Sequence, residues 1–259
     1  DYNISKIDQQ DKQIKLSFEN NKITECDFLI ISDGVFSKSK NLMSNNQTKP
    51  KYNDTLAIRG IITKTPEQID NKNISLFLNS DFHHVIYPVN SVRDLNFIAI
   101  MKYQLSKEEQ KNYSLFSDNS FIEKVLEKIP LKNKEFLDNL KELKIFPVFI
   151  SDNFYKLENN NIHLIGDAFF AIPPSFAQGA SQSIEGAYEL FKSIENNTES
   201  KFFKNRVNKL KMVNVRSKFN QFVFHLSNPL IIFFRNLFLK KLVKNNKFLE
   251  SYLGKIYKN

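Results

Sequence analysis

Alternating apolar and polar residues near the start of the chain predict an antiparallel hairpin that leads into a buried strand. Ile14, Leu16 and Phe18 alternate with polar residues, which is the pattern of a strand with one buried face. Residues 19–22 are polar and predict the turn, and residues 28–31 form a continuous apolar run. Such a run is typical of a strand inside a layered α/β sheet, because both of its faces are buried.

The middle of the chain predicts a second sheet, because short apolar segments follow one another there with little helical periodicity. We expect antiparallel strands at residues 55–63, 74–78, 84–89 and 96–101. Residues 104–143 are rich in Lys and Glu and show helical spacing. They predict two helices that Pro130 separates, since proline interrupts a helix.

The last hundred residues predict one more strand and then helices. Residues 163–165 are expected to form the strand, and residues 179–195 a helix that opens on small side chains. Two further helices are predicted in the tail, the second with Asn228 as its N-cap and Pro229 at its first position. These elements place the chain in the mixed α/β (α+β) class.

Charge is distributed unevenly along the chain, which bears on its partners. The formal net charge is +9, but residues 201–259 carry 14 bases and one acid, so the preceding 200 residues are mildly acidic. Only five of the 37 bases are Arg. Because sequence-specific nucleic-acid sites favour the guanidinium fork, we expect no nucleic-acid partner.

The basic tail has two interpretations, because its apolar residues recur at helical spacing with Lys and Arg between them. Its helices either pack on the body with a solvated basic face, or attach peripherally to an anionic membrane surface. The apolar run at residues 230–234 is far shorter than the ~20 residues of a spanning helix. A single cysteine excludes a disulfide framework, and no signal peptide is recognisable. We therefore expect a cytoplasmic protein, with or without membrane association.

Two segments combine a strand, a sharp turn and polar residues. Ser32-Asp33-Gly34 follows the first buried strand, and Gly166-Asp167 follows the later one. Each places a carboxylate and a glycine at the carboxyl end of a strand, where open α/β sheets bind ligands. The helix predicted from Gly179 directs backbone N–H groups toward whatever lies in front of it. Each motif alone is also the pattern of an ordinary turn.

Taken together and in this order, the motifs resemble those of the flavin-dependent aromatic hydroxylases. These are the class A flavoprotein monooxygenases of the salicylate and para-hydroxybenzoate hydroxylase type. The second motif is followed by Pro174-Ser175-Phe176-Ala177-Gln178-Gly179, which matches the family's Pro-x-x-x-Gln-Gly. Arg59-Gly60 and residues 84–89 resemble strands of the family's substrate domain.

The resemblance implies a domain organisation and an activity. It implies a partial FAD-binding Rossmann-like sheet at residues 1–50 and 151–200, an inserted antiparallel substrate-binding sheet at 51–150, and basic C-terminal helices at 201–259. The implied reaction is hydroxylation of a small aromatic, phenolic substrate with FAD, O2 and either NADH or NADPH. Two alternatives stay open: a related flavin-dependent reductase or oxidase for a non-aromatic substrate, and a non-catalytic module that has lost its dinucleotide-binding unit.

The resemblance also assigns cofactor-binding roles. Asp167, next to Gly166, is expected to bind a ribose or ribityl hydroxyl of FAD. Gln178, Gly179 and Ala180 are expected to place helix N–H groups near the pyrimidine edge of the flavin, where the helix dipole favours negative charge.

Three further residues are assigned to the surroundings of the cofactor. Asp33 and Gly34 are expected near FAD and the approach of the pyridine nucleotide, and Pro174 in the wall of the active site. His84, on a substrate-domain strand, is the predicted catalytic base, because a phenol reacts faster when deprotonated. Its alternative role is strand packing. His163 and His225 are expected to be a strand residue and a helix-face residue, and no metal site is predicted.

The sequence departs from the family pattern at three places. Phe170 stands where the family usually has His, and Lys40 where it usually has Arg. None of the six glycines falls in a Gly-x-Gly-x-x-Gly spacing, the fingerprint that binds the ADP half of FAD. We therefore expect the chain to be the C-terminal two-thirds of a flavoprotein.

Overall fold

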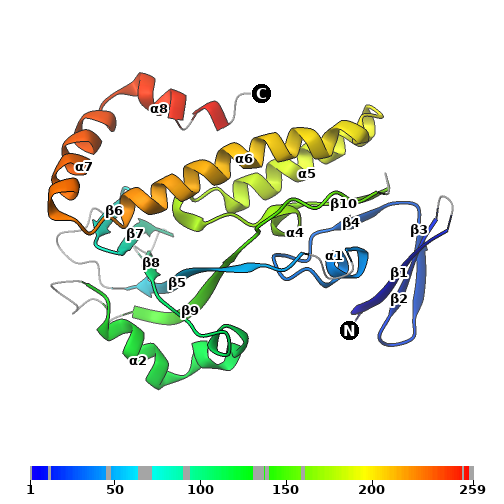
Figure 1. Ribbon diagram of the computed structural model, residues 1–259, viewed down its shortest axis with the longest axis horizontal. Coiled ribbons are helices and arrows are strands. Elements are labelled where there is room, and N and C mark those ends of the chain that lie inside the picture. The colour runs from blue at the N-terminus through cyan, green and yellow to red at the C-terminus, as the bar shows by residue number, and fades with distance from the viewer. Residues whose placement is uncertain are drawn as a thin grey trace. The chain divides into compact units, whose positions relative to one another are not determined.

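The computed structural model describes residues 2–10, 13–44, 48–63, 72–89, 94–130, 137, 140–158, 161–252 and 254–256 (Figure 1). The chain divides into two compact units, each built from two separate stretches. The first unit comprises Asp1–Lys51 and Phe149–Lys218, and the second comprises Tyr52–Val148 and Phe219–Asn259. Residues 201–259, which we expected as one group of C-terminal helices, are thus divided between the units at Lys218.

A three-stranded antiparallel sheet opens the first unit. Its strands, in the spatial order β1-β2-β3, are β1 (Ile4–Gln10), β2 (Gln13–Phe18) and β3 (Ile23–Cys26). The predicted hairpin is β2–β3 and is confirmed. Strand β1 was not predicted, because Ile4 and Ile7 are its only apolar residues; its pairing with β2 along nearly its whole length stabilises it.

The second sheet of this unit joins two short strands that are far apart in sequence. Strand β4 (Leu29–Ile31) pairs in parallel with β10 (Ile162–Leu164). Both strands were predicted, but the expectation that β4 is covered on both faces is wrong at one position. Ile31 is buried, whereas Ile30, which points to the other face, is 47% exposed.

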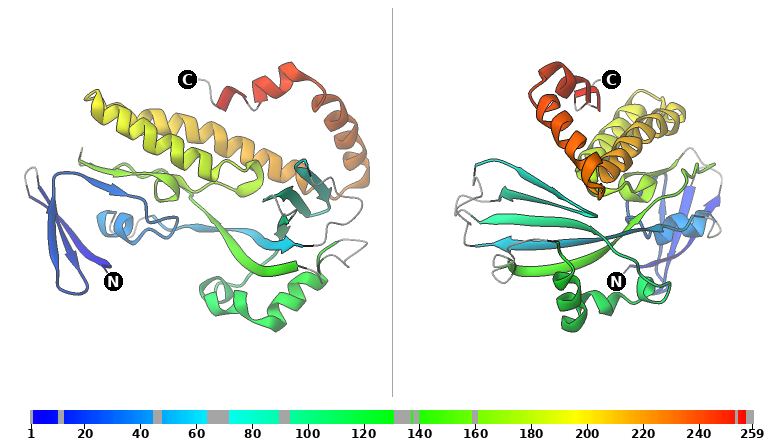
Figure 2. Two further views of the ribbon diagram at one scale, coloured as in Figure 1. Left: turned by 180° about the vertical axis from the view of Figure 1, so that it is seen from behind. Right: turned by 60° about the vertical axis from the view of Figure 1, so that its left-hand side comes forward.

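Helices cover the parallel pair and complete the core of the first unit. They are α1 (Lys38–Met43), α4 (Gly166–Phe170), α5 (Gly179–Glu195) and the part of α6 (Glu199–Phe224) that ends at Lys218. A short 3-10 turn, η3 (Pro174–Phe176), precedes α5, which begins and ends where the sequence predicts. Figures 1 and 2 show α5 and α6 side by side. The shared core consists of Ile14, Leu16, Ile31, Ile162, Leu164, Ala168, Phe169, Phe170, Leu190, Phe202 and Leu210.

A five-stranded sheet dominates the second unit, and Figure 2 shows its strands lying side by side. In spatial order the strands are β6 (Ser75–Asn79), β7 (Phe82–Pro88), β8 (Leu95–Lys102), β5 (Lys51–Ile62) and β9 (Leu140–Ile150). The β6–β7, β7–β8 and β8–β5 pairs are antiparallel, as predicted. Residues 140–143 were predicted to be helical and instead begin β9. Because β9 is an edge strand, it tolerates the charged residues that gave this segment its helix-like composition.

The remaining helical segments of the second unit lie between β8 and β9 in the sequence or follow α6. They are η1 (Glu109–Lys111), η2 (Tyr113–Ser117), α2 (Asn119–Glu127), α7 (Pro229–Leu242), α8 (Asn246–Tyr252) and η4 (Gly254–Ile256). The α2 helix confirms the first of the two helices predicted at 104–143, and most of the segment expected to form the second lies outside the described residues. The predicted cap of α7 is confirmed, since the Asn228 side chain accepts hydrogen bonds from the backbone N–H groups of Leu230 and Ile231. Among the described residues, no helix is long and apolar enough to cross a bilayer.

Two buried histidines of strand β7, His83 and His84, lie inside the second unit, and His83 contacts the half-buried His225 that follows α6. His83 Nδ1 lies 2.8 Å from Nε2 of His225, which follows the last residue of α6. His84 stacks on Phe77 with ring centroids 4.6 Å apart. Burial lowers the pKa of His83 to about 3 and the pKa values of His84 and His225 to about 4. Asp81 and Lys102 also act on His225, and their opposite charges shift its pKa in opposite directions. The imidazoles are therefore neutral in the folded protein at pH 7.

These histidines predict a loss of stability in mild acid. An unfolded histidine has a pKa of about 6.5, so between about pH 4 and pH 6.5 the unfolded chain binds more protons than the folded one. The free energy of unfolding should therefore fall as the pH is lowered through this window, and urea denaturation at a series of pH values measures it. A His225→Gln variant removes one titrating group and should show a shallower slope. A free energy that stays constant between about pH 7 and pH 5 contradicts buried neutral imidazoles.

Candidate functional site

The parallel pairing of β4 and β10 brings the two sequence motifs to one edge of the sheet. Ile31 is paired with Leu164, and the backbone N–H of Ile165 donates to the Ile31 carbonyl over 3.0 Å. Asp33-Gly34 and Gly166-Asp167 therefore leave the sheet side by side. Gly34 has φ +84° and Gly166 has φ +59°, in the left-handed region where glycine is favoured. Both turns depend on this conformational freedom.

Asp33 caps the short helix that follows its turn. Its Oδ2 accepts the backbone N–H of Ser39 over 3.1 Å, while the Ser37 hydroxyl accepts that of Lys40 over 2.9 Å. Burial raises the pKa of Asp33, but hydrogen bonds from Ser37 and Ser39 outweigh it, so the pKa lies below its usual value. The carboxylate is ionised at neutral pH and remains exposed beside the helix it caps.

The two side-chain departures from the family pattern are both buried. Lys40 is 6% exposed on α1, where burial lowers its pKa and the Asp33 carboxylate partly offsets this shift. Phe170 is 4% exposed and stacks on Phe154 with ring centroids 4.0 Å apart. Phe170 thus serves the core of the first unit and offers no polar group at this edge.

Asp167 and the N-terminus of α5 present polar groups at the same edge. Asp167 lies in the first turn of α4, where its side chain is exposed and partial desolvation raises its pKa. The first intrahelical bond of α5 joins the N–H of Gln182 to the Gln178 carbonyl over 2.8 Å. Helix geometry leaves the N–H groups of Gly179 and Ala180 without an intrahelical acceptor. Among the described residues, apart from the chain neighbours of Gly179 and the backbone of α5, no heavy atom lies within 4 Å of the place where a Gly179 Cβ would stand, so there is room for a ligand beside this helix end.

The chain turns sharply before it enters α5. Ala177 adopts a left-handed conformation, with φ +52°, directly after η3. Pro174 and Ala180, which the resemblance places next to the cofactor, are exposed. Gln178 is 9% exposed, and its Oε1 accepts from Nε2 of Gln182 over 3.4 Å. The Gln178 side chain is therefore involved in contacts within the helix.

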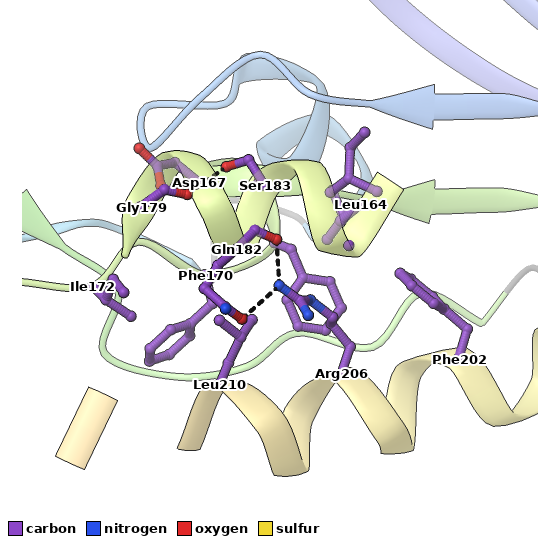
Figure 3. Close-up of a pocket in the computed structure, with 14 residues that line it drawn as sticks. Leu164, Asp167, Phe170, Ile172, Gly179, Gln182, Ser183, Phe202, Arg206 and Leu210 are labelled. Atoms are coloured by element: carbon purple, nitrogen blue, oxygen red, sulfur yellow. Dashed lines mark hydrogen bonds between the residues drawn. The ribbon is translucent and has the colours of Figure 1, made fainter. Parts of the chain in front are cut away.

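A narrow crevice lies between α4, α5 and α6, behind the residues of the edge (Figure 3). Gly166 lines it, and Figure 3 shows Asp167 and Gly179 on one side and Arg206 and Leu210 of α6 on the other. Its volume of about 10 Å³ is comparable with the ~10–15 Å³ that one water molecule requires. A flavin ring does not fit inside it, so a cofactor would have to lie on the outer side of the edge.

Arg206 is a buried cation at this crevice that the sequence analysis did not identify. It is 3% exposed and donates to both the backbone carbonyl and Oε1 of Gln182, as the dashed lines in Figure 3 show. It also lies 3.4 Å from a carboxylate oxygen of Glu189. Burial lowers its pKa, and Glu189 and Glu185 partly offset this shift. A Cβ on residue 186 would stand only 3.0 Å from Arg206 Nε, so the contact requires a small residue there. Gly186, which lies inside the predicted helix at 179–195, was the sequence signal for this close approach.

A parallel strand pair with glycine turns and a helix N-terminus at its carboxyl edge defines the nucleotide-binding class of α/β proteins. Residues 6–199 match the protein family described as "FAD binding domain", and the chain belongs to this family. The family match covers both motifs, the first unit from residue 6 to the start of α6, and the inserted sheet.

Two curated relatives and one solved structure show what the chain is similar to. The chloroplastic zeaxanthin epoxidase of an Oncidium hybrid cultivar is 22% identical over 187 residues, covering 71% of this chain and 27% of the relative. Salicylate hydroxylase of Pseudomonas putida is 24% identical over 214 residues, covering 72% of this chain and 47% of the relative. The crystal structure of Klebsiella pneumoniae HpxO complexed with FAD and uric acid has a TM-score of 0.76 at 12% identity, and covers 99% of this chain and 66% of that one. The chain therefore spans about half or less of the length of these curated relatives.

The residues at this edge fit part of an FAD molecule. Asp167 offers an exposed carboxylate that can accept a hydrogen bond from a hydroxyl, and the open end of α5 offers N–H donors to a carbonyl or anionic nitrogen. The sequence contains no Gly-x-Gly-x-x-Gly segment. The edge thus offers partners for a hydroxyl and a carbonyl of such a molecule, and the sequence offers no glycine-rich loop of this kind for its pyrophosphate.

The buried guanidinium predicts a stability difference between two basic residues of the α5–α6 pair. Arg206→Met leaves buried Gln182 and partly exposed Glu189 without this partner and should lower the free energy of unfolding by about 3 kcal/mol. Lys192→Met is the control, because the Lys192–Glu195 ion pair is about half exposed and is expected to contribute less than ~1 kcal/mol. Urea denaturation measures both variants. Equal losses would show that Arg206 does not hold the two helices together.

Proposed function

We propose that this chain is part of an FAD-dependent monooxygenase that hydroxylates a small aromatic, phenolic substrate. The observation that carries the proposal is the exposed Asp167 carboxylate beside the open N-terminus of α5, within the segment that matches the FAD-binding family. The similarity to salicylate hydroxylase and the fold shared with a protein complexed with FAD and uric acid support an aromatic substrate. NADH or NADPH would be the reductant and O2 the oxidant.

In this proposal each residue of the edge orients or stabilises the cofactor. Asp167 accepts a hydrogen bond from a ribose or ribityl hydroxyl, and Gly166 makes the turn that presents it. The N–H groups of Gly179 and Ala180 lie at the pyrimidine edge, where the positive end of α5 stabilises negative charge. Bound FAD supplies the redox chemistry, and the protein supplies orientation and exclusion of water.

Three more residues complete the proposed site. Gln178 holds the first turn of α5 through its contact with Gln182. Exposed Pro174 forms part of the wall beside the ring. Asp33 and Gly34 face the approach of the pyridine nucleotide from the neighbouring strand end.

His84 is the proposed catalytic base in the inserted sheet. Burial lowers its pKa to about 4, so the imidazole is neutral at pH 7, but the same burial makes it a weak proton acceptor. Its ring also lies 4.6 Å from the ring of Phe77 and 5.6 Å from that of Phe97, centroid to centroid. These contacts equally suit a histidine that packs the sheet, and a substitution separates the two roles.

A second candidate function is a related flavoenzyme that acts on a non-aromatic substrate. The specific observation in its favour is the similarity to zeaxanthin epoxidase over 71% of the chain. We propose a cytoplasmic location in either case. Contact of the basic C-terminal helices with a membrane is a separate proposal, which depends on the surface of α7 and not on the flavin site.

The FAD site predicts two changes in cofactor affinity. Asp167→Ala removes an acceptor from a charge-assisted hydrogen bond worth about 1.5–3 kcal/mol, so it should weaken FAD binding by about 10- to 100-fold. Gly179→Leu projects a side chain into the open approach to α5 and should weaken binding without lowering the melting temperature. Quenching of flavin fluorescence on titration with the purified chain measures the affinity. The exposed Asp152→Asn is the control.

These titrations have clear contrary outcomes. If Asp167→Ala and Gly179→Leu bind FAD as tightly as the unchanged chain, the cofactor lies elsewhere. If the unchanged chain binds no FAD, the groups of this edge are insufficient for binding by themselves.

The aromatic-substrate proposal predicts that phenols accelerate NADH or NADPH oxidation by the FAD-loaded protein. His84→Gln and His84→Phe should both lower the rate of hydroxylation at least 10-fold if His84 transfers a proton, since a base of this kind contributes about 10²–10⁴-fold. If His84 only packs the sheet, His84→Phe should keep both the rate and the melting temperature. Oxidation that no phenol accelerates, but that a non-aromatic alkene or ketone does, would favour the second candidate function.

A further inference from the structure

The outer face of α7 exposes an apolar surface within the most basic part of the chain. Leu230, Phe233, Phe234 and Leu237 recur at the spacing i, i+3, i+4, i+7, so they share one side of the helix. Their exposed fractions are 67%, 58%, 50% and 49%. The flanking Phe238 is 65% exposed. A contiguous apolar face of this kind marks a contact site for a partner.

The one charged residue in the apolar part of α7 points away from this face. Arg235 is 8% exposed, and its guanidinium donates to the backbone carbonyl of Val223 over 3.3 Å. A second guanidinium nitrogen donates to Asn236 Oδ1 over 3.1 Å. The Arg235 guanidinium is therefore bound inside the second unit, and the outer face from Leu230 to Leu237 carries no charged side chain.

Positive charge follows directly after the apolar face. Lys240 and Lys241 lie on the same side of α7 one turn further on, and Lys244 and Lys247 come after the helix. No Asp or Glu occurs between Glu199 and Glu250. A second copy whose α7 docked parallel on this face would bring lysine against lysine, and an antiparallel copy would offer these lysines no acidic partner from residues 200–249. An anionic surface matches both the charge and the apolar residues.

We propose that the outer face of α7 is a membrane-contact surface that binds bilayers containing anionic lipids. The four apolar side chains enter the boundary between headgroups and acyl chains, and the lysines extend to the phosphates and carboxylates of the headgroups. With 14 residues the helix is shorter than the ~20 residues that span a bilayer, so the attachment is peripheral.

Flotation of the full chain with lipid vesicles tests this proposal. Vesicles of phosphatidylcholine alone and of phosphatidylcholine with about 30% phosphatidylserine are compared at low and high salt, because electrostatic attachment weakens with ionic strength. The chain should float with the anionic vesicles at low salt, and high salt should release at least half of it. Phe233→Ser/Phe234→Ser and Lys240→Gln/Lys241→Gln should each reduce the bound fraction at least 5-fold.

A matched variant controls for loss of any exposed aromatic residues. Tyr188 and Phe191 of α5 are 60% and 56% exposed, close to the values for Phe233 and Phe234, but belong to the first unit. Tyr188→Ser/Phe191→Ser should float as the unchanged chain does. Melting temperatures and FAD titrations of all variants should stay unchanged, so failure of this proposal is separable from failure of the flavin site.

Three outcomes would overturn the proposal. The first is that the chain does not float with anionic vesicles at any salt concentration, and the second is that the two aromatic variants lose binding equally. The third is that vesicle binding is absent and light scattering shows a dimer, which Phe233→Ser/Phe234→Ser converts to a monomer. That result would assign the outer face of α7 to contact with a second copy of the chain.

Discussion

The structure of the candidate site depends on the parallel pairing of β4 with β10. This pairing joins residues 29–31 to residues 162–164, with the five-stranded sheet inserted between them in sequence. Because parallel strands end at one edge, Asp33 and Asp167 leave the sheet together, each next to a glycine in the left-handed region. The start of α5 reaches this edge by way of the turn at Ala177. The site therefore combines groups from three places in the chain that no local interaction would bring together.

The two carboxylates at this edge of the sheet differ in their surroundings. Asp33 is engaged in capping α1, so its charge is already balanced by hydrogen bonds, whereas Asp167 is exposed and only partly desolvated. The open N-terminus of α5 adds partial positive charge in front of it. Behind α5, Arg206 joins the helix to α6 through Gln182 and Glu189. Asp167 and the N-terminus of α5 are thus the polar groups of this edge that we propose for contact with the flavin.

The two units use their aromatic residues in different ways. In the first unit Phe169, Phe170 and Phe202 are buried in the core beneath the edge. In the second unit Phe82 and Phe97 are equally buried in the sheet, but α7 turns Phe233 and Phe234 outward. The abundance of phenylalanine is therefore not a sign of an aromatic ligand. The buried rings serve packing, and some of the exposed ones form the outer surface of α7.

The sequence by itself determined those features that depend on neighbouring residues. Periodicity located most of the strands and the whole of α5, glycine marked both turns, and Asn228-Pro229 marked the start of α7. Only the tertiary structure decided which distant groups meet: β1 on β2, His83 with His225, and Arg206 with Gln182. It also made residues 140–143 a strand, because an edge position tolerates charged residues that resemble those of a surface helix. Pairing and burial depend on groups far apart in the chain, and a local pattern contains no information about them.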